Sequence, residues 1–261
     1  MSDMARQYAG ATVVGFYGEK SDLLTRWLID LQDLVAESTP GFVSRPVDEI
    51  HATIIGLEFP TRPVVADDIL GLVSDLAQGF NNGLRLRLGG RRPSGSNFTS
   101  RGQDPYERAF SLSGGQAVLI GWPDVLACAG RFHNILAPIR RQAEKYGFRH
   151  RYHINREDSD PDLYMVIGSY DQPTTGRDAS SLSLVEDQVR NFLADHPFDI
   201  ELGAADLRLV RYRDNALGRE TSSSTPLTRD LAPDLIQDIA STATALFRQT
   251  SQAGASESHP A

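Results

Sequence analysis

Hydrophobic and polar positions in the first ninety residues follow two different periods. Short apolar runs rich in β-branched residues at 11–17 and 49–59 favour strands. At 22–35 and 67–76 the apolar residues instead recur every three or four positions, which is typical of helices with one buried face. Residues 84–90 alternate apolar with basic side chains, as a half-exposed strand does. The pattern predicts the order strand, helix, strand, helix, strand.

The second half of the chain repeats this order after an aperiodic loop at residues 91–106. The elements expected there are strand 116–122, helix 124–143, strand 162–170, helix 183–194 and two strand pieces within 198–213. We therefore expect an α+β fold with two pseudo-symmetric β-sheet lobes, outer helices and a central cleft. Strands 49–59 and 162–170 are expected to lie side by side across the pseudo-twofold axis.

The same patterns predict the domain boundaries. An N-terminal tail at 1–10 precedes a bilobal domain at 11–213, with lobe one at about 11–90 and lobe two at about 107–213. A polar connector and an extra amphipathic C-terminal helix occupy 214–248. The last residues, 249–261, lack core-forming side chains and are expected to be disordered.

Composition and charge narrow the possible functions. The 261 residues are 40% hydrophobic and 23% charged, which suits a globular protein with a core of its own. The formal net charge of −8 argues against binding long duplex nucleic acid through its phosphates, but it leaves a small phosphorylated ligand possible. One cysteine, Cys128, forms no disulfide framework, and no apolar run is long enough to span a membrane. We expect a cytoplasmic protein without a membrane partner; the sequence does not give its oligomeric state.

His51 and Thr53 are the first candidates for chemistry. Within the predicted strand 49–59, the period of two places both side chains on one face. An imidazole transfers protons near neutral pH, and a hydroxyl donates hydrogen bonds to phosphate oxygens. Together they make half of a phosphoester site. The alternative is a histidine and a threonine paired on a half-buried sheet face without any chemistry.

The four residues from His51 to Ile54, the duplicated element order over residues 10–213 and the closing segment 198–217 resemble the 2H phosphoesterase superfamily. This superfamily includes bacterial RNA 2′,3′-cyclic phosphodiesterases once named 2′-5′ RNA ligases. The resemblance implies two motifs of histidine, any residue, threonine or serine, and a hydrophobic residue on the inner strands of two lobes. One histidine would activate water against a cyclic phosphate, and the other would protonate the leaving oxygen. It implies no metal and no cofactor.

The predicted strand 162–170 carries the corresponding second segment, and there the chain departs from the family pattern. Tyr164 stands where the second histidine is expected, and Val166 stands where the second hydroxyl is expected. A phenol has an ordinary pKa of about 10 and is a poor proton donor or acceptor at neutral pH, although it can hydrogen-bond a phosphate. The second half-site is therefore either lost or rebuilt from other residues.

A basic loop shortly before Tyr164 offers substitutes. His153 or His150 is a candidate for the missing acid. Arg149 and Arg151 are candidates for charge-assisted hydrogen bonds to phosphate.

Two other interpretations of this loop are open. It is either a solvated basic segment that pairs with the acidic run at 157–160, or a metal site made of His150, His153, Asp158 and Asp160. We expect no metal, because the histidines lie on no predicted helix and no cysteine pair supports them.

These observations lead to one main prediction and two rivals. The main prediction is a phosphoesterase that hydrolyses the 2′,3′-cyclic phosphate of a small nucleotide or an RNA end by metal-free acid–base catalysis. His51 would be a base or acid, Thr53 a phosphate ligand, and His153 or Tyr164 the second proton-transfer group. The first rival is a catalytically degenerate module that binds a nucleotide or phosphate without turnover. The second is a scaffold protein without a small ligand.

Overall fold

The computed structural model describes residues 8–91, 99, 101–123, 136–153, 160–171, 176–228 and 230–256. The fold is α+β, and its described strands form one ten-stranded sheet whose pairings are all antiparallel. No helix in the described ranges is long and apolar enough to cross a membrane.

The strands are Gly10–Gly15 (β1), Val43–Ser44 (β2), Ala52–Gly56 (β3), Leu84–Leu88 (β4), Phe110–Ser113 (β5), Gln116–Pro123 (β6), Leu163–Ser169 (β7), Phe198–Leu202 (β8), Leu207–Tyr212 (β9) and Ser222–Pro226 (β10). The α-helices are Asp22–Ser38 (α1), Ala66–Gly79 (α2), Pro105–Arg108 (α3), Leu136–Gln142 (α4), Gly176–Asp195 (α5) and Pro233–Ser256 (α6). Short 3₁₀ helices occur at Val47–Glu49 (η1), Ala143–Tyr146 (η3) and Ala204–Asp206 (η4).

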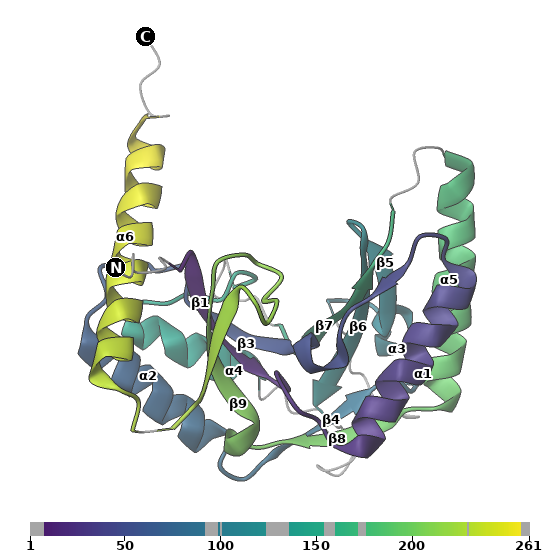
Figure 1. The fold of residues 1–261 in the computed structure, drawn as a ribbon, viewed down its shortest axis with the longest axis horizontal. Helices are drawn as coiled ribbons and strands as arrows, with labels where there is room; N and C mark the ends of the chain where they lie inside the picture. The colour runs from purple at the N-terminus through teal and green to yellow at the C-terminus, as the bar shows by residue number, and fades with distance from the viewer. Residues whose placement is uncertain are drawn as a thin grey trace.

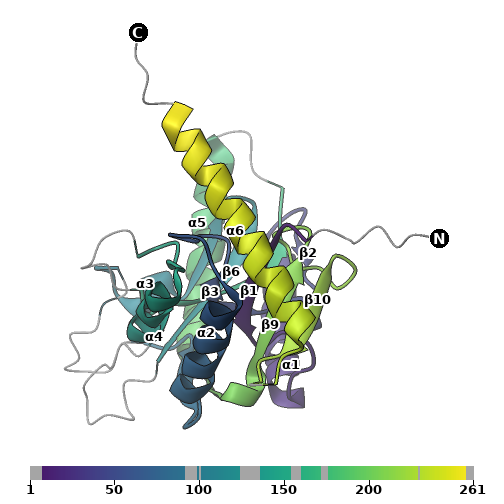
Figure 2. The same cartoon turned by 90° about the vertical axis from the view of Figure 1, so that its left-hand side faces the viewer.

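The sheet has two halves that meet where β3 pairs with β7. The strand order is β10-β9-β1-β3-β7-β6-β4-β8, with β2 paired to β7 and β5 paired to β6. In Figure 1, α2, α4 and α6 accompany the half that ends at β3, and α1 and α5 accompany the half that begins at β7. Figure 2 shows α6 crossing the outside of the first half, where it packs against α2 and β1. The predicted pair of central strands is confirmed.

The two halves do not follow the predicted division of the chain into lobes at about 11–90 and 107–213. Strand β4 comes from the predicted first lobe but pairs with β6 and β8, whereas β9 comes from the predicted second lobe but pairs with β1. Charge favours the pairing of β4 with β8, because its two arginines lie opposite two carboxylates of β8. In this register Arg85 lies opposite Glu201 and Arg87 lies opposite Asp199.

Two further segments differ from prediction, and a third lies partly outside the described ranges. Strand β10 occupies part of the predicted connector and pairs with β9. Helix α6 continues to Ser256, into the tail that composition predicted to be disordered; the hydroxyls of Thr250 and Ser251 bond carbonyls one turn back within the helix. Of the predicted helix 124–143, residues 124–135 lie outside the described ranges, and the described part forms α4 and the start of η3.

A β-bulge occurs at the same place in each central strand. Against β1, the extra residue of β3 is Ile54, and against β6, the extra residue of β7 is Ile167. Each is the fourth residue of its motif segment, counted from His51 or from Tyr164. Bulges redirect the side chains that follow them. The two halves therefore share a bulge at the same position of their motif segments.

Buried side chains from the surrounding helices bind the carbonyls of both bulges. Arg140 on α4 donates from Nε to the Ile54 carbonyl at 3.0 Å, and Gln32 on α1 donates from Nε2 to the Ile167 carbonyl at 2.7 Å. Bulged backbone lacks its ladder partners, and a buried carbonyl without a donor is costly. Arg140 and Gln32 therefore fix the shape of the two strands that meet at the centre.

Candidate functional site

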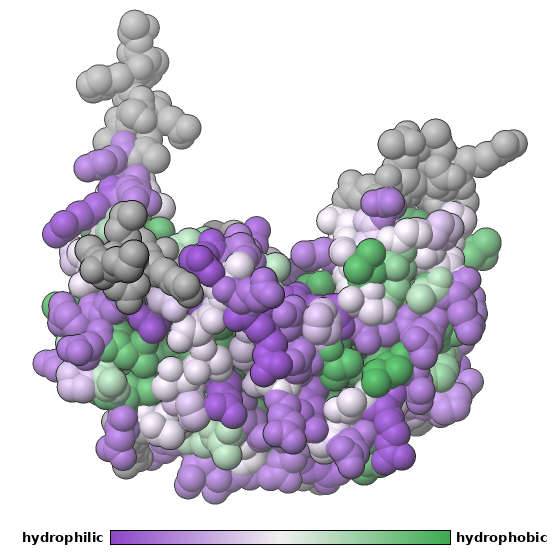
Figure 3. All heavy atoms as spheres, viewed as in Figure 1, coloured by the Kyte–Doolittle hydropathy of each residue, from purple (hydrophilic) through white to green (hydrophobic). Residues whose placement is uncertain are grey.

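A cavity of ≈ 410 Å³ lies over the junction of β3 and β7. Ala52 is opposite Met165, so in antiparallel register His51 is opposite Val166 and Thr53 is opposite Tyr164. The side chains of both pairs line the cavity. Figure 3 shows the molecule hollowed between the half that carries α6 and the half that carries α5.

The wall of this cavity combines residues from the central strands, β6 and α4 with residues from four loops. It consists of Arg45, His51, Thr53, Gly56, Glu58, Phe59, Gln116, Arg140, His150, Arg151, Tyr152, Asp160, Asp162, Tyr164, Val166, Asn215 and Ala216. His51 itself directly precedes β3, so the strand begins at the second residue of the motif and not at the predicted residue 49.

His51 and Tyr164 form one diagonal of the square made by these two pairs. Diagonal neighbours on one face of an antiparallel sheet lie about 7–8 Å apart, which long side chains span. Thr53 sits between them at the adjacent corner. An imidazole and a phenol therefore face the same space from opposite strands, with a hydroxyl beside it.

The tautomer of His51 is set by the backbone. Its Nδ1 lies 2.8 Å from the carbonyl oxygen of Glu49, which can only accept, so Nδ1 carries the proton and Nε2 carries the lone pair. Burial, helped by the nearby cations Arg45 and Lys20, lowers the pKa of His51 to about 4, and the hydrogen bond to Glu49 opposes this shift. The imidazole is thus neutral at pH 7, with Nε2 able to accept a proton.

Tyr164 is held by an arginine and a buried carboxylate. Arg108 Nη2 donates to the Tyr164 hydroxyl at 3.0 Å and lies 2.9 Å from Asp162 Oδ2. Burial raises the pKa of Tyr164, while the Arg108 and Arg101 charges oppose that rise. The phenol oxygen accepts this hydrogen bond through a lone pair, so its own O–H can donate to a second group. Tyr164 therefore stays protonated at neutral pH as a hydrogen-bond donor.

Arg45 is a cavity residue that sequence reasoning missed. Its backbone N–H donates to the Ile167 carbonyl at 2.9 Å, which places Arg45 beside the bulge of β7. In the part of the chain that the structure describes, its buried Nε and Nη2 have no hydrogen-bond partner. Burial lowers the pKa of Arg45, yet a guanidinium remains charged. A cation with unbonded donors in a cavity wall is suited to an anionic ligand.

The basic loop at 149–153 is divided between the cavity and its surroundings. His150 and Arg151 line the cavity, whereas Arg149 is exposed outside the wall. His153 is 1% exposed and packs behind His150, with ring centroids 5.0 Å apart. The structure therefore brings His150 and Arg151 to the same wall as His51, and it does not bring His153 or Arg149 there.

His150 is a weak candidate for proton transfer despite its place in the wall. Burial lowers its pKa to about 2, helped by the charges of Arg140, His153 and Arg101. Its Nδ1 lies 3.9 Å from Asp160 Oδ2, which also lies 3.5 Å from Arg140 Nη1. Of the acidic run, only Asp160 lies in the described ranges, and it is buried and pairs with Arg140 and Arg101, which lie outside the basic loop.

No three histidine, cysteine, aspartate or glutamate side chains in the described ranges are placed to hold a metal ion together. Asp158, one of the four ligands considered, lies outside those ranges.

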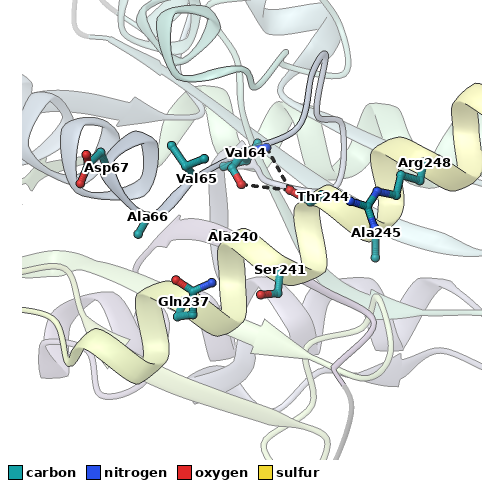
Figure 4. A pocket seen from close by; sticks show the side chains of 10 residues that line it. All are labelled: Val64, Val65, Ala66, Asp67, Gln237, Ala240, Ser241, Thr244, Ala245 and Arg248. Atoms are coloured by element: carbon teal, nitrogen blue, oxygen red, sulfur yellow. Dashed lines mark hydrogen bonds between the residues drawn. The ribbon is translucent and has the colours of Figure 1, made fainter.

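A larger groove of ≈ 560 Å³ lies between α6 and the segment leading into α2 (Figure 4). Thr244 there accepts a hydrogen bond from the Val64 N–H and donates one to the Val64 carbonyl, both at 3.0 Å. The described wall holds small, aliphatic and a few polar side chains, with Asp67 and Arg248 as its charged groups and no histidine or tyrosine. This groove joins α6 to the fold and offers no proton-transfer pair.

Comparisons with known proteins assign no function. No protein-family model matches the chain, and no curated protein matches it. Among solved structures, it is similar to a conserved protein of unknown function from Agrobacterium tumefaciens, with a TM-score of 0.42, 16% identity and coverage of 81% of this chain and 87% of that chain. A protein of Thermus thermophilus is similar with a TM-score of 0.40, 14% identity and coverage of 84% and 95%. At these scores neither likeness carries a functional argument.

Proposed function

We propose that this cavity hydrolyses a phosphodiester, namely the 2′,3′-cyclic phosphate of a nucleotide or an RNA end, by metal-free acid–base catalysis. The observation that carries the proposal is the β3–β7 register, which sets His51 diagonal to Tyr164 with Thr53 beside them. The proposal keeps the resemblance to 2H phosphoesterases, with a tyrosine in place of the second histidine.

The proposed reaction uses each group in the state described above. Thr53 and Arg45 donate hydrogen bonds to the phosphate oxygens. His51 Nε2 takes a proton from water as the water oxygen attacks phosphorus. The bond from phosphorus to the ribose oxygen breaks, and the Tyr164 O–H gives its proton to that oxygen. The imidazolium then returns one proton to the tyrosinate through solvent, so the site is restored and water has been added across the P–O bond.

A tyrosine with a raised pKa is adequate as the acid in this step, because the leaving group is an alkoxide that is more basic than a phenolate. Arg108 supports the transfer, since it donates to the same oxygen that becomes negative. Arg45 supplies donors on the side where Val166 offers no hydroxyl. These contacts support a rebuilt second half-site.

The rival function is binding without turnover, in which the same cavity holds a nucleotide or phosphate. One observation favours it: the burial that raises the pKa of Tyr164 also makes the phenol a weaker acid than a histidine. Loss of a general acid lowers a rate by about 10² to 10⁴-fold, which would leave a slow enzyme or a binding protein.

One set of substrates distinguishes turnover from binding without turnover. The full-length protein is incubated in chelator with 2′,3′-cyclic nucleotides and with short RNAs ending in a cyclic phosphate, and the products are resolved by chromatography. We expect conversion to phosphate monoesters, reduced about 10²-fold or more in Tyr164→Phe, which keeps the ring and removes the proton. Nucleotide binding in calorimetry without any conversion would overturn hydrolysis and establish the binding module.

A further inference from the structure

Two exposed aromatic side chains mark one end of the cavity. Phe59 and Tyr152 are each 42% exposed, and no other Phe, Tyr or Trp of the described ranges is classed as exposed. Both line this cavity. The Arg149 N–H bonds the Phe59 carbonyl at 3.1 Å, which holds their two loops side by side. Exposed aromatic rings at a cavity mouth are suited to stacking against a planar ligand.

Arg101 and Tyr164 hold the Tyr152 ring in place. The Arg101 guanidinium lies 4.5 Å from its centroid, and the Tyr164 ring stacks on it at 6.5 Å with an interplanar angle of 27°. The ring is therefore fixed next to the proposed acid, and a ligand would contact the part of the ring that these neighbours leave exposed.

Glu58 adds a hydrogen-bond acceptor at the same end. The Tyr212 hydroxyl bonds its carboxyl group, while its Oε2 is buried without a hydrogen-bond partner among the described residues. The carboxylate lies over Gly56, where a Cβ would come within 2.5 Å of Oε2. The terminal torsion of a glutamate is broad, so this oxygen can turn toward a donor in the cavity. A buried acceptor without a donor costs free energy that a ligand N–H would offset.

The distance between Thr53 and the end of the cavity with Glu58 and Tyr152 fits a nucleotide. Thr53 and Gly56 are three residues apart on β3, which is about 10 Å at ~3.3 Å per residue and less across the bulge. A phosphate held by His51 and Thr53 would therefore have its nucleoside directed toward Glu58 and Tyr152.

Resting on the proposed function, we propose that Phe59, Tyr152 and Glu58 form a nucleobase subsite, in which the base stacks on the aromatic rings and its exocyclic amino group donates to the Glu58 carboxylate. The substrate is then a nucleotide of cytosine, adenine or guanine, and a uracil nucleotide binds less well because a carbonyl occupies the place of the amino group.

Cytidine and uridine nucleotides test this subsite, because they differ in the exocyclic group at position 4 and in the protonation of the adjacent ring nitrogen. Binding of 3′-CMP and 3′-UMP to the full chain is measured by calorimetry at pH 8, which requires no turnover. We expect the wild-type protein to prefer 3′-CMP about tenfold, as one hydrogen bond to a charged group provides. Glu58→Gln is expected to abolish or reverse this preference, because its amide can donate to the uracil carbonyl.

Tyr152→Ala is expected to weaken binding of both nucleotides about tenfold while leaving their ratio unchanged. Leu184→Ala, at an exposed apolar residue outside the cavity wall, serves as the matched control and should change neither. Equal affinities for the two nucleotides in the wild-type protein and in Glu58→Gln would overturn the subsite. Base preference without hydrolysis of the cyclic nucleotides would instead overturn the proposed reaction and leave the subsite standing.

Discussion

His51→Ala is expected to lower kcat/KM for a 2′,3′-cyclic nucleotide by about 10² to 10⁴-fold, which is the usual contribution of a positioned general base. The physical reason is the fixed tautomer: with Nδ1 donating to the Glu49 carbonyl, Nε2 is the nitrogen that can take the proton of water. The measurement is steady-state turnover followed by chromatography, with the melting temperature recorded for each variant.

His196→Ala is the control for this prediction. His196 is exposed, stacks on Phe192 and lies outside the cavity wall, so its loss should leave kcat/KM within about twofold of the wild-type value. A His51→Ala protein that folds and turns over at the wild-type rate would show that the base is a different group.

Arg140→Ala is expected to lower the free energy of unfolding by about 3–5 kcal/mol, the cost of removing one member of a buried charged network. The Arg140 side chain is 2% exposed and donates to the carbonyls of Ile54, Thr53, Asp160 and Asp162 at 2.8–3.0 Å. Alanine leaves these carbonyls without this donor and leaves the Asp160 carboxylate without its closest cation. Chemical denaturation monitored by circular dichroism measures the change.

Arg141→Ala is the matched control, one residue along the same helix. Arg141 pairs with Glu144 at the surface with 3.5 Å between Nη1 and Oε1, and exposed pairs contribute about 0–1 kcal/mol. Arg140→Lys should restore little of the lost stability, because an ammonium group lacks the planar fork of donors with which the guanidinium reaches four carbonyls. If Arg140→Ala and Arg141→Ala were equally stable, the bulge of β3 would not depend on Arg140.

The motif residues could be located from sequence because strands have a period of two. That period places His51 with Thr53 and Tyr164 with Val166, and the structure brings both pairs to one cavity. The repeated order of elements in the two halves of the chain also predicted that the two strands lie side by side. Local pattern was sufficient here because the two cavity-facing residues of each motif precede its bulge.

The residues beyond the bulge could not be predicted in this way. Regular alternation from Thr53 directs residues 55 and 57 toward the cavity, whereas the extra residue at Ile54 directs Gly56 and Glu58 there instead. A bulge depends on the partner strand and leaves no mark in the hydrophobic pattern. Arg45 was missed for a related reason, because it lies after a two-residue strand that no periodicity reveals.

The sequence also could not distinguish His150 from His153, because their positions depend on the turn that connects them. The His153 N–H bonds the His150 carbonyl at 2.9 Å, so the two residues face different ways from one tight turn. Sequence spacing made them equal candidates, and the turn places His150 in the cavity wall and His153 behind it. The pairing of strands could not be predicted from the sequence either, since the alternation in β4 predicted a strand but not its pairing with β8.

The pH dependence of kcat/KM for one 2′,3′-cyclic nucleotide tests the central claim most directly, because it reports the acid and the base of the free enzyme. His51 acts when neutral, and burial holds its pKa at about 4, so activity should fall tenfold per pH unit only below about pH 4. Tyr164 acts when protonated, and burial raises its pKa above the ordinary phenol value of about 10, so the rate should stay level to at least pH 9. The predicted result is a kcat/KM that stays constant from just above pH 4 to at least pH 9. A bell centred near pH 7, with limbs where ordinary histidines titrate, would contradict the pairing of a buried neutral His51 with Tyr164.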